Sequence, residues 1–410
     1  MRGIRRHGAI AALLAALTPG MSGCVRAPVA ADTGREALVA WAAREASPVT
    51  SAALGRLAGK ARVVALGESA HGIEATLATR NEVFRHLVRD HGFTAVALET
   101  GYAESLRVAA FIDGAAGDAR EVARTSFTSG FGHFAGNVSL IEWMREHNAT
   151  APAGRRLRLI GIDLSLGGPL GSWATPAPAE CALEAIASRQ PQESARLRRQ
   201  FAAEIAGPLG RQAPLTPAEQ ERYAAFAREV AVAANASRSA VAMRCAAVAE
   251  QAGEVSRVTP PSPAGGILPS AWRALEARDL AMAANALWAL EQLGPGGRLL
   301  VFAHNAHVVN EPQRGEHLRR LAQPPRSMGQ RLREALSADL VIVAEAAPGG
   351  GGQDFGDLLR TSLAVPRLLD LRAAPPASGG WLLHPQRLRA NVDGSAVVTP
   401  ATAFDALLVR

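Results

Sequence analysis

Short runs of apolar residues alternate with longer amphipathic segments over much of the chain. Residues 62–67, 94–98 and 158–162 are such runs, and a strand formed from any of them would be apolar on both faces. Strands of this kind are typical of a parallel sheet that helices cover on both sides. The intervening residues 74–91 place apolar side chains at helical spacing and are followed by Gly92, a common helix end. The alternation predicts an α/β fold of three layers, with a parallel sheet in the middle.

The strand pattern stops near residue 177. From there to about residue 251 the sequence is rich in Ala, Glu and Arg at helical period, and Gly-Pro and Thr-Pro pairs divide it into separate helices. Strand candidates return at residues 298–303 and 340–344, and residues 405–410 suit a last strand at the edge of the sheet. The predicted organisation is a first half of the α/β core at residues 35–175, a helical insertion at 176–265 and a second half of the core at 266–410.

The composition is that of an ordinary globular protein, with 48% hydrophobic and 20% charged residues. The formal net charge of +7 comes from arginine, because Lys60 is the only lysine. The arginines are spread along the chain among Asp and Glu, whereas nucleic-acid binders gather them into clusters or helical stripes. We therefore expect no nucleic-acid partner.

The first residues have the pattern of an export signal. Three arginines within the first six residues precede a short apolar run at residues 9–17, far below the roughly 20 residues that a membrane span needs. The sequence Met-Ser-Gly-Cys at residues 21–24 resembles a bacterial lipobox, in which the cysteine receives a lipid and becomes the mature N-terminus. We expect a signal peptide at residues 1–23, a tether at 24–34 and lipid attachment at Cys24, with no other membrane contact.

An ordinary secretory peptide is the alternative, because Met21 stands where leucine is usual in a lipobox. Val25 stands in place of the aspartate that commonly retains lipoproteins at the inner membrane, which favours an outer-membrane anchor facing the periplasm. An oxidising compartment would permit a disulfide between Cys181 and Cys245. Two unpaired buried cysteines are equally compatible with the sequence.

Polar residues directly follow three of the predicted strands. In chain order, these strand ends carry Glu68 and His71, Glu99 and Tyr102, and His304 and His307. Ligands of open parallel sheets bind outside the carboxyl ends of the strands, so the three clusters should meet in one crevice. Two carboxylates and three histidines at equivalent strand ends are hard to explain structurally, and we expect an active site there.

Several short motifs run in order along nearly all of the chain. They are Gly67-Glu68-x-x-His71-Gly72 with Arg80, Leu98-Glu99, Trp143-Met144-Arg145 with Asn148, Gly161-Ile162-Asp163, Arg278-Asp279-x-x-Met282-Ala283-x-Asn285, His304-Asn305-Ala306-His307-Val308 and Phe404-Asp405-Ala406-Leu407. Together they resemble the erythromycin esterase family, whose members hydrolyse the macrolactone ester of erythromycin-type macrolides. The resemblance implies a parallel α/β core with a helical insertion beside the cleft and no cofactor. Carried over by position, the functional residues are Glu68, His71, Arg80, Glu99, His304 and His307.

Opening a lactone with water needs a base that deprotonates the water and donors that hold the oxyanion. A histidine titrates in the useful range, and a neighbouring carboxylate can orient it. We expect His71 as the base, oriented by Glu68 or Glu99, with His304 and Arg80 polarising the carbonyl; an exchange of roles between His71 and His304 is also compatible. The residues expected to bind substrate are Arg80, Tyr102, His133 and His307. The prediction is a metal-independent carboxylic ester hydrolase acting on a small-molecule ester or lactone, with macrolide resistance as its consequence.

Three alternatives stay open at this point. Ser69 lies on a strand-to-helix turn as a hydrolase serine would, but His71 occupies the last position of the Gly-x-Ser-x-Gly pattern. The two carboxylates and two of the histidines could instead ligate zinc or manganese. A haem- or small-molecule-binding lipoprotein without catalysis would use Tyr102 or His133. His133 stands between Phe131 and Phe134, where the family that the chain resembles tends to have an aromatic-rich segment lining the substrate cleft, and otherwise suits an exposed loop.

Replacing Cys24 by alanine should abolish lipid attachment, because this cysteine would carry the acyl chains. The several acyl chains of a bacterial lipoprotein anchor stably, whereas a single chain binds a membrane only marginally. The measurement is incorporation of labelled palmitate in cells that express the wild type or Cys24→Ala. Equal labelling of the two proteins, or no labelling of either, would contradict the lipoprotein interpretation.

Overall fold

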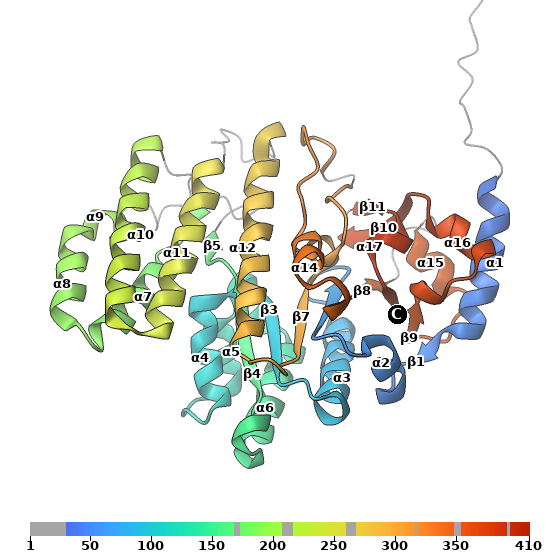
Figure 1. The fold of residues 1–410 in the computed structure, drawn as a ribbon, viewed down its shortest axis with the longest axis horizontal. Helices are drawn as coiled ribbons and strands as arrows, with labels where there is room; N and C mark the ends of the chain where they lie inside the picture. Colours follow the sequence, from blue (N-terminus) through green and yellow to red (C-terminus); the bar gives the residue numbers. More distant parts are fainter. Residues whose placement is uncertain are drawn as a thin grey trace, which may run out of the picture.

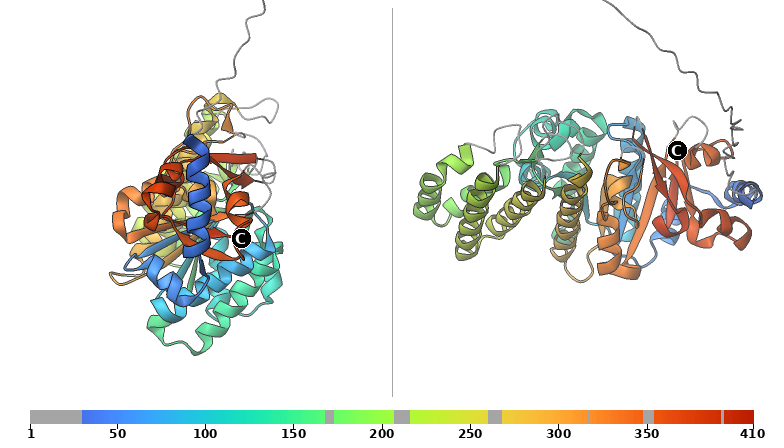
Figure 2. Two further views of the ribbon diagram at one scale, coloured as in Figure 1. Left: turned by 90° about the vertical axis from the view of Figure 1, so that its right-hand side faces the viewer. Right: turned by 90° about the horizontal axis from the view of Figure 1, so that it is seen from above.

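An eight-stranded sheet forms the centre of the fold, with helices against both of its faces (Figure 1, Figure 2). The structure is a computed structural model that describes residues 30–167, 173–206, 216–259, 268–315, 318–347, 354–391 and 394–410. The expected signal peptide, the lipid-attachment residue Cys24 and the start of the tether lie outside the described residues. The predicted α/β fold is confirmed.

The strands lie in the order β1, β9, β12, β8, β2, β7, β3, β4. Their bounds are β1 Ser47–Pro48, β2 Val63–Glu68, β3 Ala95–Gly101, β4 Arg158–Asp163, β7 Leu299–His304, β8 Leu340–Ala346, β9 Arg367–Asp370 and β12 Ala406–Val409. Strand β7, from the second half of the sequence, lies between β2 and β3 and is parallel to both. The carboxyl ends of these three strands are therefore neighbours, as the strand-end clusters predicted.

The last strand is not at the edge of the sheet, and this prediction is wrong. Strand β12 pairs in parallel with β8 and antiparallel with β9, and β1 adds a further antiparallel pair beyond β9. Strands β9 and β1 have only four and two residues, too few to show a period in the sequence. Their antiparallel pairing covers the edge of β12 and makes the sheet mixed. Two small two-stranded sheets pair β5 (Leu166–Gly167) with β6 (Trp173–Ala174) and β10 (Gln386–Asn391) with β11 (Gly394–Val398).

Helices cover both faces because alternate residues of each strand point to opposite sides. The first face packs against α2 (Ser51–Ala58), α3 (Glu74–His91), α4 (Tyr102–Ile112), α5 (Ala119–Ser126) and α6 (Ala135–Thr150). The second packs against α1 (Ala30–Glu45), α12 (Trp272–Glu291), α14 (Met328–Leu336), α15 (Phe355–Arg360), α16 (Pro376–Leu382) and α17 (Pro400–Ala403). Within β2, Val64 and Leu66 belong to the hydrophobic core on the first face of the sheet, while Val63 and Ala65 belong to the core on the second face. Burial on both sides explains the unbroken apolar runs of the sequence.

Five further helices lie beyond β4, at the left of Figure 1. They are α7 (Ala177–Ala187), α8 (Pro191–Gln200), α9 (Ala202–Ala206), α10 (Pro217–Ser237) and α11 (Ala240–Val258). Helices α7, α8, α10 and α11 share a hydrophobic core that also reaches α4 and α12. A disulfide joins Cys181 of α7 to Cys245 of α11, so the bridged alternative left open by the sequence is the one found. Among the described residues, no helix is both long and apolar enough to cross a bilayer.

Candidate active site

A carboxylate–histidine pair forms at the end of β2. Glu68 is the last residue of this strand, and the following residues turn from the strand into α3. The Nδ1 atom of His71 lies 2.6 Å from Oε1 of Glu68, in a hydrogen bond. The side chain of His71 is 39% exposed, whereas that of Glu68 is only 5% exposed. The imidazole is therefore accessible, and a buried carboxylate holds it from the side of Nδ1.

The surroundings of this pair raise the pKa of His71. Burial alone would lower the pKa of His71, but the hydrogen bond to Glu68 and the charges of Glu99 and Glu68 outweigh burial and raise this pKa above its ordinary value. Burial raises the pKa of Glu68, although the hydrogen bond to His71 acts in the opposite direction. The second oxygen of Glu68, Oε2, is buried and has no hydrogen-bond partner among the described residues.

His304 lies opposite Glu68 in the β2–β7 register, and its ring centroid is 5.1 Å from that of His71. Its Nδ1 accepts a hydrogen bond from the backbone N–H of Ala306, at the start of the short helix α13 (Asn305–Val308). Burial lowers the pKa of His304 to about 3, so the ring is neutral. A neutral ring that accepts through Nδ1 carries its proton on Nε2. His304 can therefore donate a hydrogen bond through Nε2, for which the backbone of Ser69 is a competing acceptor.

The carboxylate of Glu99, in β3, binds groups other than His71. Its Oε2 accepts a hydrogen bond of 2.8 Å from the backbone N–H of His304. Its Oε1 lies 3.0 Å from Nη2 of Arg278 and 3.2 Å from Nε2 of His307. Burial would raise the pKa of Glu99, but His307 and Arg278 hold it well below its ordinary value. Of the two carboxylates expected to orient His71, the structure brings Glu68 to it.

His307 is held between two carboxylates. Its Nδ1 lies 2.6 Å from Oδ1 of Asp279, and its Nε2 faces Glu99. Asp279 also accepts hydrogen bonds from the side chain of Gln313 and the backbone of Met328, at 2.7 and 2.9 Å. Burial would lower the pKa of His307, but Asp279 and Glu99 raise it to about 10. His307 is therefore a buried imidazolium at neutral pH, with both ring nitrogens engaged.

Three further charged residues, Asp163, Arg278 and Asp279, belong to the motifs shared with the family, although no role was expected for them. Arg278 of α12 donates to both oxygens of Asp163, at 2.9 and 2.6 Å, and to Glu99. The charges then alternate in the order Asp163, Arg278, Glu99, His307, Asp279. Asp163 ends β4 as Glu68 ends β2, and that position was the signal available in the sequence. Arg278 and Asp279 come from a helix, for which no such rule exists.

Two glycines of the first motif make room for this arrangement. A Cβ atom on Gly67 would lie 2.1 Å from Oδ1 of Asn305, so a larger residue would displace that side chain. Gly72 has a φ of +76°, and a Cβ there would lie 2.3 Å from the ring of Phe134. The turn that carries His71 therefore requires glycine on each side.

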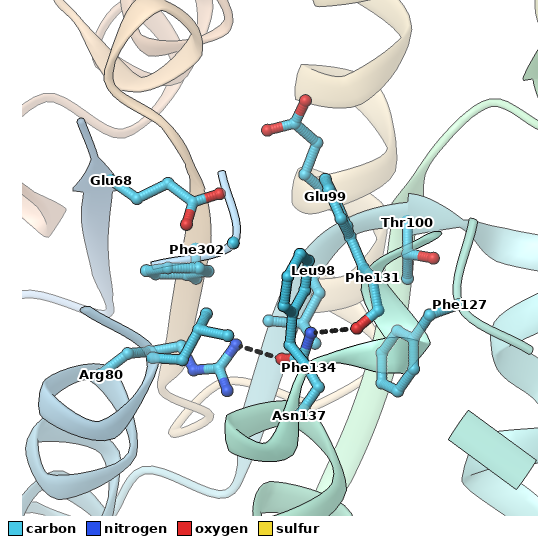
Figure 3. A pocket seen from close by; sticks show the side chains of 12 residues that line it. Glu68, Arg80, Leu98, Glu99, Thr100, Phe127, Phe131, Phe134, Asn137 and Phe302 are labelled. Atoms are coloured by element: carbon cyan, nitrogen blue, oxygen red, sulfur yellow. Dashed lines mark hydrogen bonds between the residues drawn. The ribbon is translucent and has the colours of Figure 1, made fainter. Parts of the chain in front are cut away.

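A small apolar pocket lies beside Glu68 and Glu99 (Figure 3). Its apolar lining consists of Leu77, Leu98, Phe127, Phe131, Phe134 and Phe302. Its volume of about 20 Å³ admits one water molecule or a similarly small group. In the view of Figure 3, the ring of Phe302 lies between the Glu68 carboxylate and the Arg80 guanidinium, which is 4.9 Å from the ring centroid.

Arg80 lines the same pocket but is only 1% exposed. It donates to Oδ1 of Asn137 at 2.8 Å and to Oδ1 of Asn81, and so links α3 to the start of α6. Burial lowers the pKa of Arg80 to about 10, which leaves it charged at neutral pH. Most of its donors are thus engaged within the protein.

Three of the residues expected to bind substrate, Tyr102, His133 and His307, do not line this pocket. Tyr102 is 5% exposed and packs edge-on against Trp288, with ring centroids 5.5 Å apart, beside a separate cleft along α4. His133 is exposed at the end of the 3-10 helix Thr128–His133. Phe131 of the same segment contacts His71, with ring centroids 5.0 Å apart. Phe131 and Phe134 of this aromatic segment also line the pocket.

The chain is similar to known proteins in both sequence and structure. The sequence model described as erythromycin esterase matches residues 88–362, more than half of the chain. Erythromycin esterase type I from Escherichia coli is 35% identical over 104 residues, which cover 25% of this chain and 24% of that protein. Erythromycin esterase type II from Escherichia coli is 33% identical over 115 residues, covering 28% and 26%. The aligned part thus spans about a quarter of the length of each relative.

Solved structures share the fold. A protein from Bacillus cereus has a TM-score of 0.72 at 19% identity, and a succinoglycan biosynthesis protein has 0.75 at 20%; each alignment covers 91% of this chain and 96% of the other. A mutant of the erythromycin esterase EreC in its open conformation has a TM-score of 0.62 at 20% identity, covering 87% and 92%. These identities support the fold alone. The match of the family model over residues 88–362 shows that this chain belongs to the erythromycin esterase family.

Proposed function

We propose that this protein hydrolyses a macrolactone or a related carboxylic ester, with His71 as the base that activates water. The observation that carries the proposal is the 2.6 Å hydrogen bond from His71 Nδ1 to the buried Glu68, on an imidazole that is itself 39% exposed. Glu68 orients the ring and stabilises its charged form, while Nε2 is left to accept a proton from water. For Nε2, no hydrogen-bond partner is found in the part of the chain that the structure describes.

The reaction proceeds in two steps. Water gives a proton to His71 Nε2 as its oxygen attacks the ester carbonyl carbon, which produces a tetrahedral oxyanion. The bond from that carbon to the alcohol oxygen then breaks, and the His71 imidazolium returns the proton to the leaving oxygen. The products are a carboxylic acid and an alcohol, and a lactone gains one water. His304, neutral and protonated on Nε2, is the donor proposed for the oxyanion.

The protonation states favour His71 over the other two histidines as the base. His304 has its Nδ1 lone pair occupied by Ala306, and burial keeps its pKa near 3. His307 is protonated up to a pH of about 10, because the pKa of this residue is raised by Asp279 and Glu99 despite burial. Neither ring offers a free basic nitrogen at neutral pH. The alternative in which His304 is the base and His71 polarises the carbonyl is therefore the weaker assignment.

We further propose that the substrate is an erythromycin-type macrolide and that its hydrolysis confers resistance. The names of the two Escherichia coli relatives support this substrate class. The lipobox-like sequence that ends at Cys24 supports an enzyme anchored in the cell envelope by an N-terminal lipid, at the outer membrane facing the periplasm.

Replacing His71 by alanine should lower the turnover of erythromycin by at least about 100-fold, the usual contribution of a positioned base. The measurement is mass spectrometry of the macrolide after incubation with purified protein, where hydrolysis adds one water. The matched control is His86→Ala, which removes a histidine of α3 that contacts Glu82 and Arg89 of the same helix. Near-normal turnover by a folded His71→Ala protein would falsify the proposed base.

The pH dependence of kcat/KM should report the His71 pKa. Activity should rise with pH through an apparent pKa above the ordinary histidine value of about 6.5, because only the neutral ring can accept a proton. Glu68→Gln keeps an acceptor oxygen but removes the negative charge that helps to raise this pKa, so the acidic limb should move to lower pH while kcat falls. An acidic limb that stays in place in Glu68→Gln would mean that another group titrates.

Removal of metal should leave the activity unchanged, because the proposed base acts on water directly. Within the described ranges, no three His, Cys, Asp or Glu residues are grouped so that they could hold a metal ion. The test is exhaustive dialysis against a chelator, followed by metal analysis and assay. Stoichiometric zinc or manganese, with activity lost on its removal and regained on its return, would favour the metal-dependent alternative.

A further inference from the structure

A fully buried carboxylate lies beneath the turn that carries His71. Glu345 of β8 has an exposed fraction of 0%. Its Oε2 accepts hydrogen bonds from both the backbone N–H and the hydroxyl of Ser69, each at 2.8 Å. Its Oε1 accepts from the Thr76 hydroxyl and from Nε of Arg410, each at 2.6 Å. Both oxygens are thus satisfied by donors within the protein.

The hydroxyl groups of Ser69 and Thr76, which both donate to Glu345, lie on either side of His71 in the sequence. Ser69 directly follows Glu68 and lies two residues before His71, while Thr76 lies in the first turn of α3. Glu345 therefore holds both ends of the segment that carries His71. Hydrogen bonds to an ionised carboxylate are roughly twice as strong as neutral ones. The adjacent Arg410 compensates the buried charge, which would otherwise be costly.

The backbone of Glu345 is bound to the second histidine segment. Its N–H donates to Oδ1 of Asn305 at 3.1 Å, and its carbonyl oxygen accepts from Nδ2 of Asn305 at 2.8 Å. Asn305 lies between His304 and His307 in the sequence. One residue of β8 thus binds the His71 turn through its side chain and the His304–His307 turn through its backbone.

We propose that Glu345 is a positioning residue that keeps His71 aligned with Glu68 and His304. Glu345 does not line the pocket beside Glu68 and Glu99, so it acts through the turn. Thr76 and Arg410 complete its hydrogen bonding. The inference rests on the proposed function, because alignment of His71 matters to the reaction only if His71 is the base.

The test begins with Glu345→Gln, in which an amide group replaces one acceptor oxygen and meets donors instead. We expect kcat for the macrolide to fall about 10- to 100-fold, because a displacement of about 1 Å at a reacting group has effects of that size. KM should change little, because Glu345 is fully buried and cannot touch a bound substrate.

The variant should also move the acidic limb of kcat/KM to lower pH, since a looser hydrogen bond to Glu68 raises the pKa of His71 less. The other titratable groups that face His71 are Glu99, His304 and His307, and none of them is changed.

A second pair of variants covers the case in which Glu345→Gln does not fold. Thr76→Val removes one hydroxyl donor at nearly constant volume and should lower kcat several-fold, while Thr76→Ser keeps the hydroxyl and should restore it. The control is Asp405→Asn, which removes a carboxylate that accepts from Ile342 N–H at 2.7 Å and pairs with Arg333. Ile342 lies toward the opposite end of β8, so this control should keep the wild-type kcat and acidic limb.

The outcomes separate the two claims. An inactive wild type would overturn the proposed function and the inference together. An active wild type with an inactive His71→Ala, but with unchanged kcat and acidic limb in Glu345→Gln and Thr76→Val, would overturn the positioning role alone. Equal losses in Asp405→Asn would trace the effect to general stability and would also overturn it.

Discussion

Five charged side chains alternate in sign across the carboxyl end of the sheet, and the rest of the site depends on their pairing. In order they are Asp163, Arg278, Glu99, His307 and Asp279. Their side chains are between 1% and 17% exposed, so an unpaired charge here would cost several kcal/mol. Each group is therefore held by its neighbours, and together they fix the ends of β3, β4 and β7 against α12.

This pairing divides the polar residues into two sets. The charge of Glu99 is compensated by Arg278 and His307, and that of His307 by Glu99 and Asp279. Glu99 also accepts a hydrogen bond from the backbone of His304. His304 remains neutral beside them, and Glu68 and His71 remain as a separate pair whose imidazole is accessible. The five paired charges therefore hold the strand ends in place, and the proposed chemistry belongs to Glu68, His71 and His304 beside them.

The sequence predicted those parts of the fold and site that follow from parallel strands. Runs that are apolar on both faces identified β2, β3, β4, β7 and β8, and the common direction of the strands brought Glu68, Glu99 and His304 together. Arg278 and Asp279 were missed as site residues because helical period does not reveal which turn of a helix reaches the sheet end. Tyr102 follows β3 and His133 lies within the aromatic segment, but neither lines the pocket beside Glu68 and Glu99, because position in the chain does not determine side-chain direction. Strands β9 and β1 are too short for any period to appear.

The central claim is that burial and pairing give the three histidines of the site different protonation states. The most direct test is an NMR titration of the selectively labelled imidazoles in the folded protein, with His71→Ala and His304→Ala spectra for assignment. We predict that His304 stays neutral down to a pH of about 3, since burial lowers its pKa, and that His307 stays protonated up to about 10, since Asp279 and Glu99 outweigh burial and raise its pKa. His71 should titrate between them, above the ordinary histidine pKa. A His304 that gains a proton near neutral pH, or a His307 that loses its proton there, would contradict the account.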